Sequence, residues 1–156
     1  MGVVLAAFLF MRRMINVTKV NSVTESLEED ENPNDPDSLS KRHIPKGIEV
    51  YEINGPFFFG AADKFKDTIR EIEKPPKVLI LRMRYVPMMD ATGLCALEDV
   101  FNKAKKDGMT LILSEINVQP RKIIENTGLR ERIGKENIVG DIDTALARAK
   151  VILNAK

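Results

Sequence analysis

Hydrophobic residues from about residue 47 onward fall in short runs that alternate with amphipathic stretches. Apolar or alternating runs predict strands at residues 48–53, 78–81, 109–113 and 137–139. The run 78–81 (VLIL) contains no polar position, which is typical of a strand covered on both faces. A further run, Phe57-Phe58-Phe59, follows the turn residues Asn54-Gly55-Pro56. It predicts a second short strand, so that two strands open the domain as a hairpin.

Apolar stripes at helical spacing lie between these strands. The clearest are Ala62, Phe65, Ile69 and Ile72; then Leu94, Leu97, Phe101 and Ala104; and last Ile142, Leu146, Ala149 and Leu153. A short helix with Pro120 in its first turn and Gly128 at its end fits before the last strand. The order β-β-α-β-α-β-α-β-α predicts an α/β fold over residues 47–156, with a mostly parallel central sheet flanked by helices.

The front of the chain has a different character. Residues 1–11 (MGVVLAAFLFM) carry no charge and are followed at once by Arg12 and Arg13. Eleven helical residues span about 16 Å, roughly half of a bilayer core. A secretory signal places its positive charges before the apolar run, whereas here they follow it. Residues 1–15 are therefore predicted to be the cytoplasmic end of a transmembrane helix. An apolar N-terminal helix of a soluble core is the alternative.

Residues 16–46 are polar and acidic, with no basic residue between Lys19 and Lys41. Pro33 and Pro36 interrupt the segment, and neither helical nor strand periodicity is present. Such a composition predicts a solvated, flexible acidic linker that separates the first segment from a domain at residues 47–156. The histidine of the chain, His43, lies in this linker and is expected to be exposed and without function.

Composition argues against several classes of function. Lys and Arg total 24 against 23 Asp and Glu, so the basic footprint of a nucleic-acid-binding protein is missing. One cysteine, Cys95, and one histidine cannot form a disulfide or a Cys/His zinc site within one chain. Gly55 and Gly60 have the spacing of a phosphate loop, but alanines stand where it needs Lys and Ser or Thr. Neither a metal nor a catalytic residue is expected, and the protein is predicted not to be an enzyme.

The most informative segment is Asp90-Ala91-Thr92-Gly93-Leu94, which joins a predicted buried strand to a helix. Free amides and the helix dipole at such a position favour an anionic group. The structural alternative is that Asp90 or Thr92 caps the helix, Gly93 relieves packing against the sheet and Leu94 fills the core.

This segment resembles the Asp-Ser-(Ser/Thr)-Gly-Leu signature of STAS domains, which occur in bacterial anti-anti-sigma factors and at the C-terminus of SulP anion transporters. The apolar run that ends in Arg12-Arg13 resembles the end of the last transmembrane helix of SulP transporters. The resemblance implies a STAS fold, a regulatory loop at Asp90 to Leu94, and a cytoplasmic position beside the plasma or inner membrane. It also implies three partners: the transporter's transmembrane domain, a second copy in a homo-oligomer, and a cytosolic protein.

One position departs from the signature. The anti-anti-sigma factors carry a phospho-acceptor serine after the aspartate, where this chain has Ala91. The departure favours a regulatory domain of a sulfate or related anion transporter over a free-standing partner-switching regulator. A nucleotide-sensing module with weak GTP or ATP binding is the other alternative. Glu98 and Lys105 lie off the apolar stripe of the helix that follows, and are expected to form an exposed contact face.

Overall fold

The computed structural model describes residues 6, 9, 19–22 and 34–155. The prediction that residues 1–15 end a transmembrane helix therefore lies outside the described residues, apart from Ala6 and Leu9. No helix within the described part is both long enough and apolar enough to span a bilayer.

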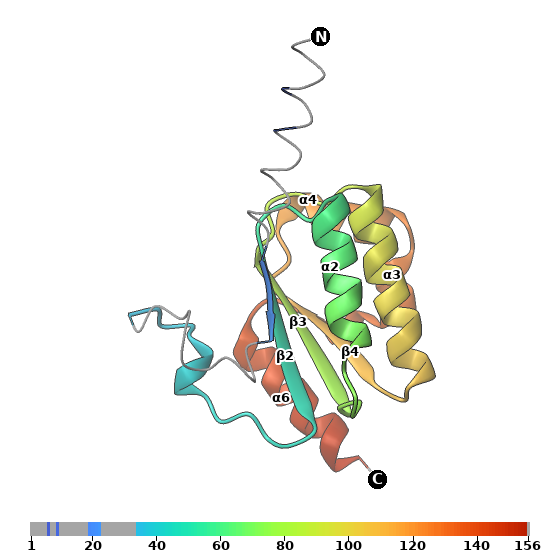
Figure 1. Ribbon diagram of the computed structural model, residues 1–156. Helices are drawn as coiled ribbons and strands as arrows, with labels where there is room; N and C mark the ends of the chain where they lie inside the picture. Colours follow the sequence, from blue (N-terminus) through green and yellow to red (C-terminus); the bar gives the residue numbers. More distant parts are fainter. Residues whose placement is uncertain (1–5, 7–8, 10–18, 23–33, 156) are drawn as a thin grey trace.

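A five-stranded sheet in the order β1-β2-β3-β4-β5 forms the centre of the fold (Figure 1). Its strands are β1 (Lys19–Ser22), β2 (Ile48–Asn54), β3 (Val78–Tyr85), β4 (Thr110–Ser114) and β5 (Ile138–Val139). The last four run parallel, and β1 joins the edge of β2 antiparallel. In this register Lys19 lies opposite Asn54, so the chain enters at the carboxyl end of β2.

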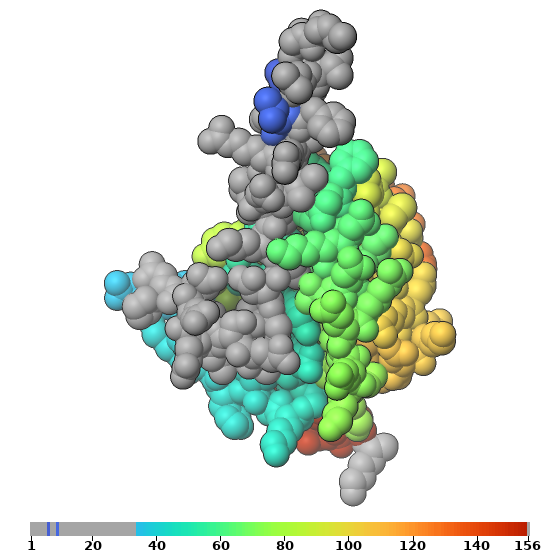
Figure 2. Space-filling view, viewed as in Figure 1, coloured from blue at the N-terminus to red at the C-terminus, as the bar shows by residue number. Residues whose placement is uncertain are grey.

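Helices cover both faces of the sheet, as the alternating pattern predicts. The first face carries α2 (Phe59–Arg70), α3 (Ala91–Lys106), α4 (Val118–Asn126) and α5 (Leu129–Ile133), and the second carries α6 (Ile142–Asn154). Two 3₁₀ turns, η1 (Leu39–Lys41) and η2 (Lys135–Asn137), complete the elements. Figure 2 shows α2 in green beside α3 in yellow on the outside of the first face. The α/β fold with a mostly parallel sheet is confirmed.

Strand β3 shows why two separate cores form. Leu79, Leu81 and Met83 face the helices of the first face, whereas Val78 and Ile80 pack toward α6 on the second. Side chains alternate along a strand, so an apolar run without polar positions supplies both cores at once. The prediction that residues 78–81 form a strand covered on both faces is confirmed.

The predicted hairpin at the start of the domain is wrong. Phe57 forms only an isolated bridge to Met89, Phe58 is the N-cap residue of α2, and Phe59 is the first residue of that helix. Phe57 is fully buried, with its ring edge-on to that of Phe65 at 5.4 Å between centroids, while Phe59 is exposed. The antiparallel partner of β2 is instead β1, from the predicted linker. Aromatic content alone did not distinguish a strand from a buried turn and a helix start.

The predicted flexible linker over residues 16–46 also needs correction, because β1 and residues 34–46 belong to the folded unit. We call residues 34–46 the strap. Leu39 of the strap is 0% exposed and packs in the second core with Val50 and Ile80. Arg42 donates from Nε and from a terminal nitrogen to the two carboxylate oxygens of Asp143 on α6, at 2.6 and 2.8 Å. His43 is exposed, as predicted.

A buried arginine of β3 holds the strap to the sheet. Arg82 is 0% exposed, and its Nε and a terminal nitrogen donate to the two carboxylate oxygens of Glu115, the latter at 2.9 Å. Its other terminal nitrogen donates to the carbonyl oxygen of Asp37 at 2.9 Å and lies 3.6 Å from a carboxylate oxygen of Glu52. The Asp37 carbonyl of the strap thus accepts a hydrogen bond from the buried Arg82 guanidinium, in addition to those accepted by Glu115.

A second arginine of β3 repeats the pattern nearer the solvent. Arg84 donates to the Asp35 carboxylate of the strap at 2.6 Å and to the Glu52 carboxylate at 3.0 Å. Because the Asp35 carboxylate pairs with Arg84, an ion pair binds this part of the strap to the sheet. The arginine partners of the strap lie 45 or more positions away, beyond the reach of a local sequence pattern.

We predict that Leu39→Ala lowers the free energy of unfolding of the intact chain by about 2–5 kcal/mol, since it empties a fully buried site. Urea unfolding measures the change. The matched control is Lys46→Ala, at an exposed strap position, which should alter stability by no more than about 0.5 kcal/mol. A Leu39→Ala effect as small as that of the control would contradict packing of the strap.

A second prediction concerns acid. The hydrogen bonds from Arg42, aided by its charge, hold the pKa of Asp143 below its ordinary value of 3.8. A group whose pKa is lowered by folding stabilises the folded state above its unfolded pKa, and that stabilisation is lost as pH falls through the folded pKa. Stability should therefore decline below about pH 4. In Asp143→Asn the decline should be shallower and start from a less stable chain at pH 7.

Urea unfolding at several pH values between 7 and 3 checks this. The exposed Glu131→Gln on α5 is the control, and its curve should run parallel to that of the parent chain. A parallel curve for Asp143→Asn would show that the Arg42 pair contributes nothing to the acid response.

Candidate functional site

The signature loop lies at the carboxyl ends of the parallel strands, between β3 and α3. Asp90 has an extended backbone and is the N-cap of α3, because its Oδ1 accepts a hydrogen bond from the Gly93 amide at 2.8 Å. Thr92 is already inside the helix and is half-buried. Of the two capping residues considered from the sequence, the structure selects Asp90.

Gly93 is required by a close approach of two backbones. A Cβ at this position would lie 2.2 Å from the carbonyl oxygen of Phe57 and 2.9 Å from its ring. The first turn of α3 therefore packs directly on the segment that precedes α2. Leu94 is half-buried and packs against the first core. The Asp-x-x-Gly-Leu part of the signature is explained by capping, close approach and packing.

Neighbouring segments hold the loop from both sides. The Phe57 amide donates to the Met88 carbonyl at 2.9 Å. From the other side, Gln119 accepts from the Met89 amide at 2.9 Å and donates to the Met89 carbonyl at 3.0 Å. The Asn117 amide group donates to the Val86 carbonyl at 2.8 Å. The loop is thus fixed by Asn117, the N-cap residue of α4, and by Gln119 in the first turn of α4.

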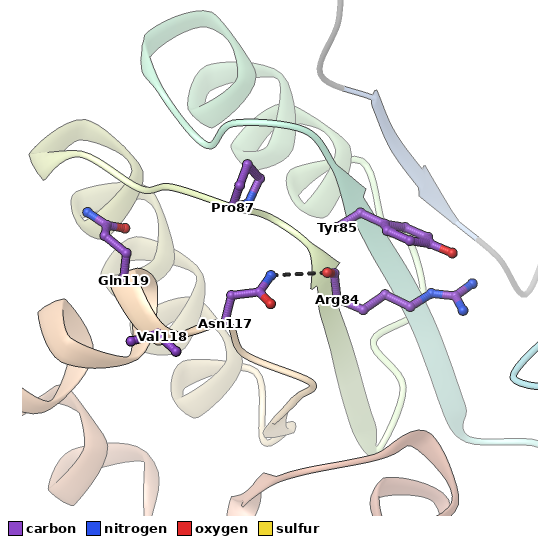
Figure 3. A pocket seen from close by; sticks show the side chains of 6 residues that line it. All are labelled: Arg84, Tyr85, Pro87, Asn117, Val118 and Gln119. Carbon is purple, nitrogen blue, oxygen red and sulfur yellow. Dashed lines mark hydrogen bonds between the residues drawn. The ribbon is translucent and has the colours of Figure 1, made fainter.

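A shallow groove of about 650 Å³ opens beside this loop, lined by Arg84, Tyr85, Pro87, Asn117, Val118 and Gln119. Figure 3 shows Val118 and Gln119 at the start of α4, and Tyr85 and Arg84 on the side of β2. The Arg84 guanidinium stacks over the Tyr85 ring, 4.4 Å from its centroid.

Asn117, Gln119 and Tyr85 were not identified from the sequence. A signal for them exists, since the residues that follow adjacent parallel strands meet at one edge of the sheet. Asn117 follows β4, and Tyr85 ends β3. The sequence does not reveal which of these polar side chains point inward to brace a loop.

Ala91, the position of the phospho-acceptor in the resembled signature, is exposed on the first turn of α3. It carries no hydroxyl group that a kinase could modify. The nearest hydroxyl in the signature belongs to Thr92, one position into the helix. The loop therefore presents a methyl group where the partner-switching mechanism needs a serine.

The two helix-face residues differ from each other. Lys105 is exposed, as expected. The expectation for Glu98 needs correction, because its side chain is only 32% exposed and accepts from Arg132 of α5 at 2.7 Å. Arg132 also lies over the ring of Phe101, 5.4 Å from its centroid. A charge reversal at Glu98 would disturb an intramolecular pair, so Lys105 is the cleaner probe of this face.

The main cluster of ionisable side chains in the described part consists of ion pairs around Arg82 and Arg84. Among the described residues, no group of three or more His, Cys, Asp or Glu side chains could hold a metal ion. Within the same residues Cys95 is exposed on α3 and is not in a disulfide. The features that stand out are a braced loop, a capped helix and an apolar groove on a small α/β domain.

This chain belongs to the STAS domain family, whose sequence profile matches residues 41–145. It is 33% identical over 138 residues to the putative sulfate transporter YvdB of Bacillus subtilis, covering 87% of this chain but 24% of that protein. The chain thus spans about a quarter of the length of this relative.

Two crystal structures support the assignment. The chain is 45% identical to a sulfate transporter family protein from Wolinella succinogenes, with a TM-score of 0.74, covering 78% of this chain and all of that one. It is 30% identical to the SulP transporter STAS domain from Vibrio cholerae, with a TM-score of 0.65, covering 77% of this chain and 94% of that one. The chain is homologous to STAS domains of SulP transporters.

We predict that Gly93→Ala lowers the free energy of unfolding by about 1–3 kcal/mol or more, because the added methyl group overlaps the Phe57 carbonyl. Gly140→Ala is the matched control, since a Cβ there meets nothing within 4 Å. Thermal unfolding of the two variants measures the difference. Equal melting temperatures would contradict the close approach as the reason for glycine.

Proposed function

We propose that this chain is the cytosolic, C-terminal regulatory and interaction domain of a SulP-type transporter of sulfate or a related anion. The observation that carries the proposal is the 45% identity, over 78% of this chain, to a protein of the sulfate transporter family. The apolar residues 1–11 and Arg12-Arg13 support it, because they have the order expected at the cytoplasmic end of a membrane helix.

The domain acts by contact and not by catalysis in this proposal. Its partners are the membrane domain of the same transporter, a second copy of the chain and a cytosolic protein. Ala91 supports a role in a transporter over phosphorylation-driven partner switching, because the exposed signature position lacks the acceptor hydroxyl. Lys105 on α3 is the position of the helix face best suited to report such a contact in uptake measurements.

The groove supports contact with a protein over nucleotide sensing. Phosphate recognition needs donors that are free to turn toward the ligand. Here the Asn117 and Gln119 amides are engaged with backbone groups of the loop, and Arg84 is engaged with Asp35 and Glu52. Binding of GTP or ATP at this groove would have to break those bonds.

Cys95 offers a direct test of the proposed membrane topology, because it is exposed on the folded domain. In the full-length protein with its other cysteines replaced, a membrane-impermeant maleimide should label Cys95 in inverted vesicles and not in right-side-out vesicles. Cys95→Ser is the control for background labelling. Labelling from the outer side, or recovery of the full-length protein entirely in the soluble fraction, would refute the proposal.

A further inference from the structure

Exposed apolar side chains are concentrated at one end of the domain. Six large hydrophobic side chains are exposed in the described part, and four of them lie at or just after the carboxyl ends of consecutive parallel strands. These four are Phe59 after β2, Tyr85 at the end of β3, Met88 after β3, and Val118 after β4. Val118 is 71% exposed although it is the first residue of a helix that packs on the core.

The groove beside Val118 presents an apolar surface on a rigid frame. Its exposed chemistry is that of Tyr85, Pro87 and Val118, since the side-chain amides of Asn117 and Gln119 are occupied in holding the loop. Interface centres are characteristically depleted in charge and enriched in aromatic residues and methionine. A surface that is already ordered costs little conformational entropy on binding.

The register of β1 places the chain entry beside this groove. Lys19 pairs with Asn54, and Asn54 in turn pairs with Tyr85 across β3. The Gly55 amide donates to the Tyr85 carbonyl at 2.9 Å, which fixes the same neighbourhood. Five residues lie between Arg13 and Lys19, and the six steps from one to the other span at most about 20 Å when the chain is fully extended. A membrane domain that packs around residues 1–13 would therefore lie within reach of the groove.

We infer that the groove formed by Tyr85, Pro87 and Val118 receives an apolar side chain from the cytosolic end of a membrane helix, in the transporter part that precedes this chain. The inference rests on the proposed function, and it names the partner of the interaction surface. The concave shape and the engaged polar groups favour a protein side chain over a lipid headgroup, which would require free cationic donors at the rim.

The test uses the full-length protein in its native membrane, with a photoreactive benzoylphenylalanine at position 118. The matched probe is at position 151, where Val151 of α6 is 60% exposed outside the groove. Irradiation and mass spectrometry identify the crosslinked peptide. We expect products with a cytosolic segment of the membrane part, in the same or a neighbouring copy, at least tenfold more abundant from position 118 than from position 151.

A second variant guards against a probe that perturbs the site. Val118→Asp places a carboxylate in the first turn of α4, which a helix N-terminus tolerates. Folding should be retained, as a melting temperature within a few degrees of the parent would show. With the photoreactive residue moved to position 88, Val118→Asp should lower the yield of the same crosslink about tenfold, because a charge now enters the apolar groove.

Equal yields from positions 118 and 151 would overturn the inference. Crosslinking from position 118 to lipid, to residues 1–18 or to a separate cytosolic protein would overturn it as well. These failures are distinguishable from failure of the proposed function. If Cys95 is labelled only from the cytosolic side while the crosslink is missing, the topology stands and the docking site is wrong.

Discussion

The buried guanidinium of Arg82 is the constraint on which the arrangement of this domain depends. α6 packs on the second face of the sheet, and the charged side chains of that face gather toward the carboxyl ends of β2, β3 and β4. A buried charge is costly unless it is paired and fully hydrogen-bonded. Glu115 supplies a bidentate carboxylate, and the strap supplies the Asp37 carbonyl. To do so, Glu115 adopts a left-handed backbone with φ of 57° directly after β4.

The separation in sequence between interacting residues decides which parts of the fold could be predicted. Parts held by local contacts could be predicted, and parts held by distant residues could not. The parallel sheet and its helices follow from local periodicity, and Pro120, Gly128 and Asp90 mark helix boundaries as expected. The strap could not be read in this way. Its polar, proline-containing sequence is typical of a solvated linker, and the contacts that make it part of the fold come from distant residues: the arginines of β3, Asp143 of α6 and the second core. Leu39 and Ile44 are isolated aliphatic residues in a polar segment, and they give no periodic signal although Leu39 is fully buried and Ile44 packs against the second core.

The candidate site shows a similar division. The Asp90 loop was identified because its signature residues are adjacent in the sequence. In the structure, two of these residues serve mainly to form and pack α3. Asp90 caps α3, and Gly93 allows α3 to touch the Phe57 backbone. The groove that we assign to membrane-helix contact lies next to the signature and is lined by Tyr85 and Val118. Tyr85 ends β3 and Val118 begins α4, so their proximity depends on the strand order, which becomes known only once the sheet is assembled.

Arg84 links the strap to the groove. Its guanidinium binds the Asp35 carboxylate on the strap and the Glu52 carboxylate on β2, and it stacks on the Tyr85 ring that borders the groove. A cation–π contact depends on where the cation is held, since the attraction falls off within about 6 Å of the ring centroid. Displacement of the strap would remove one of the two carboxylates that position this cation. The strap therefore shares Arg84 with the surface that we assign to membrane-helix contact, so a rearrangement of one changes the electrostatic environment of the other.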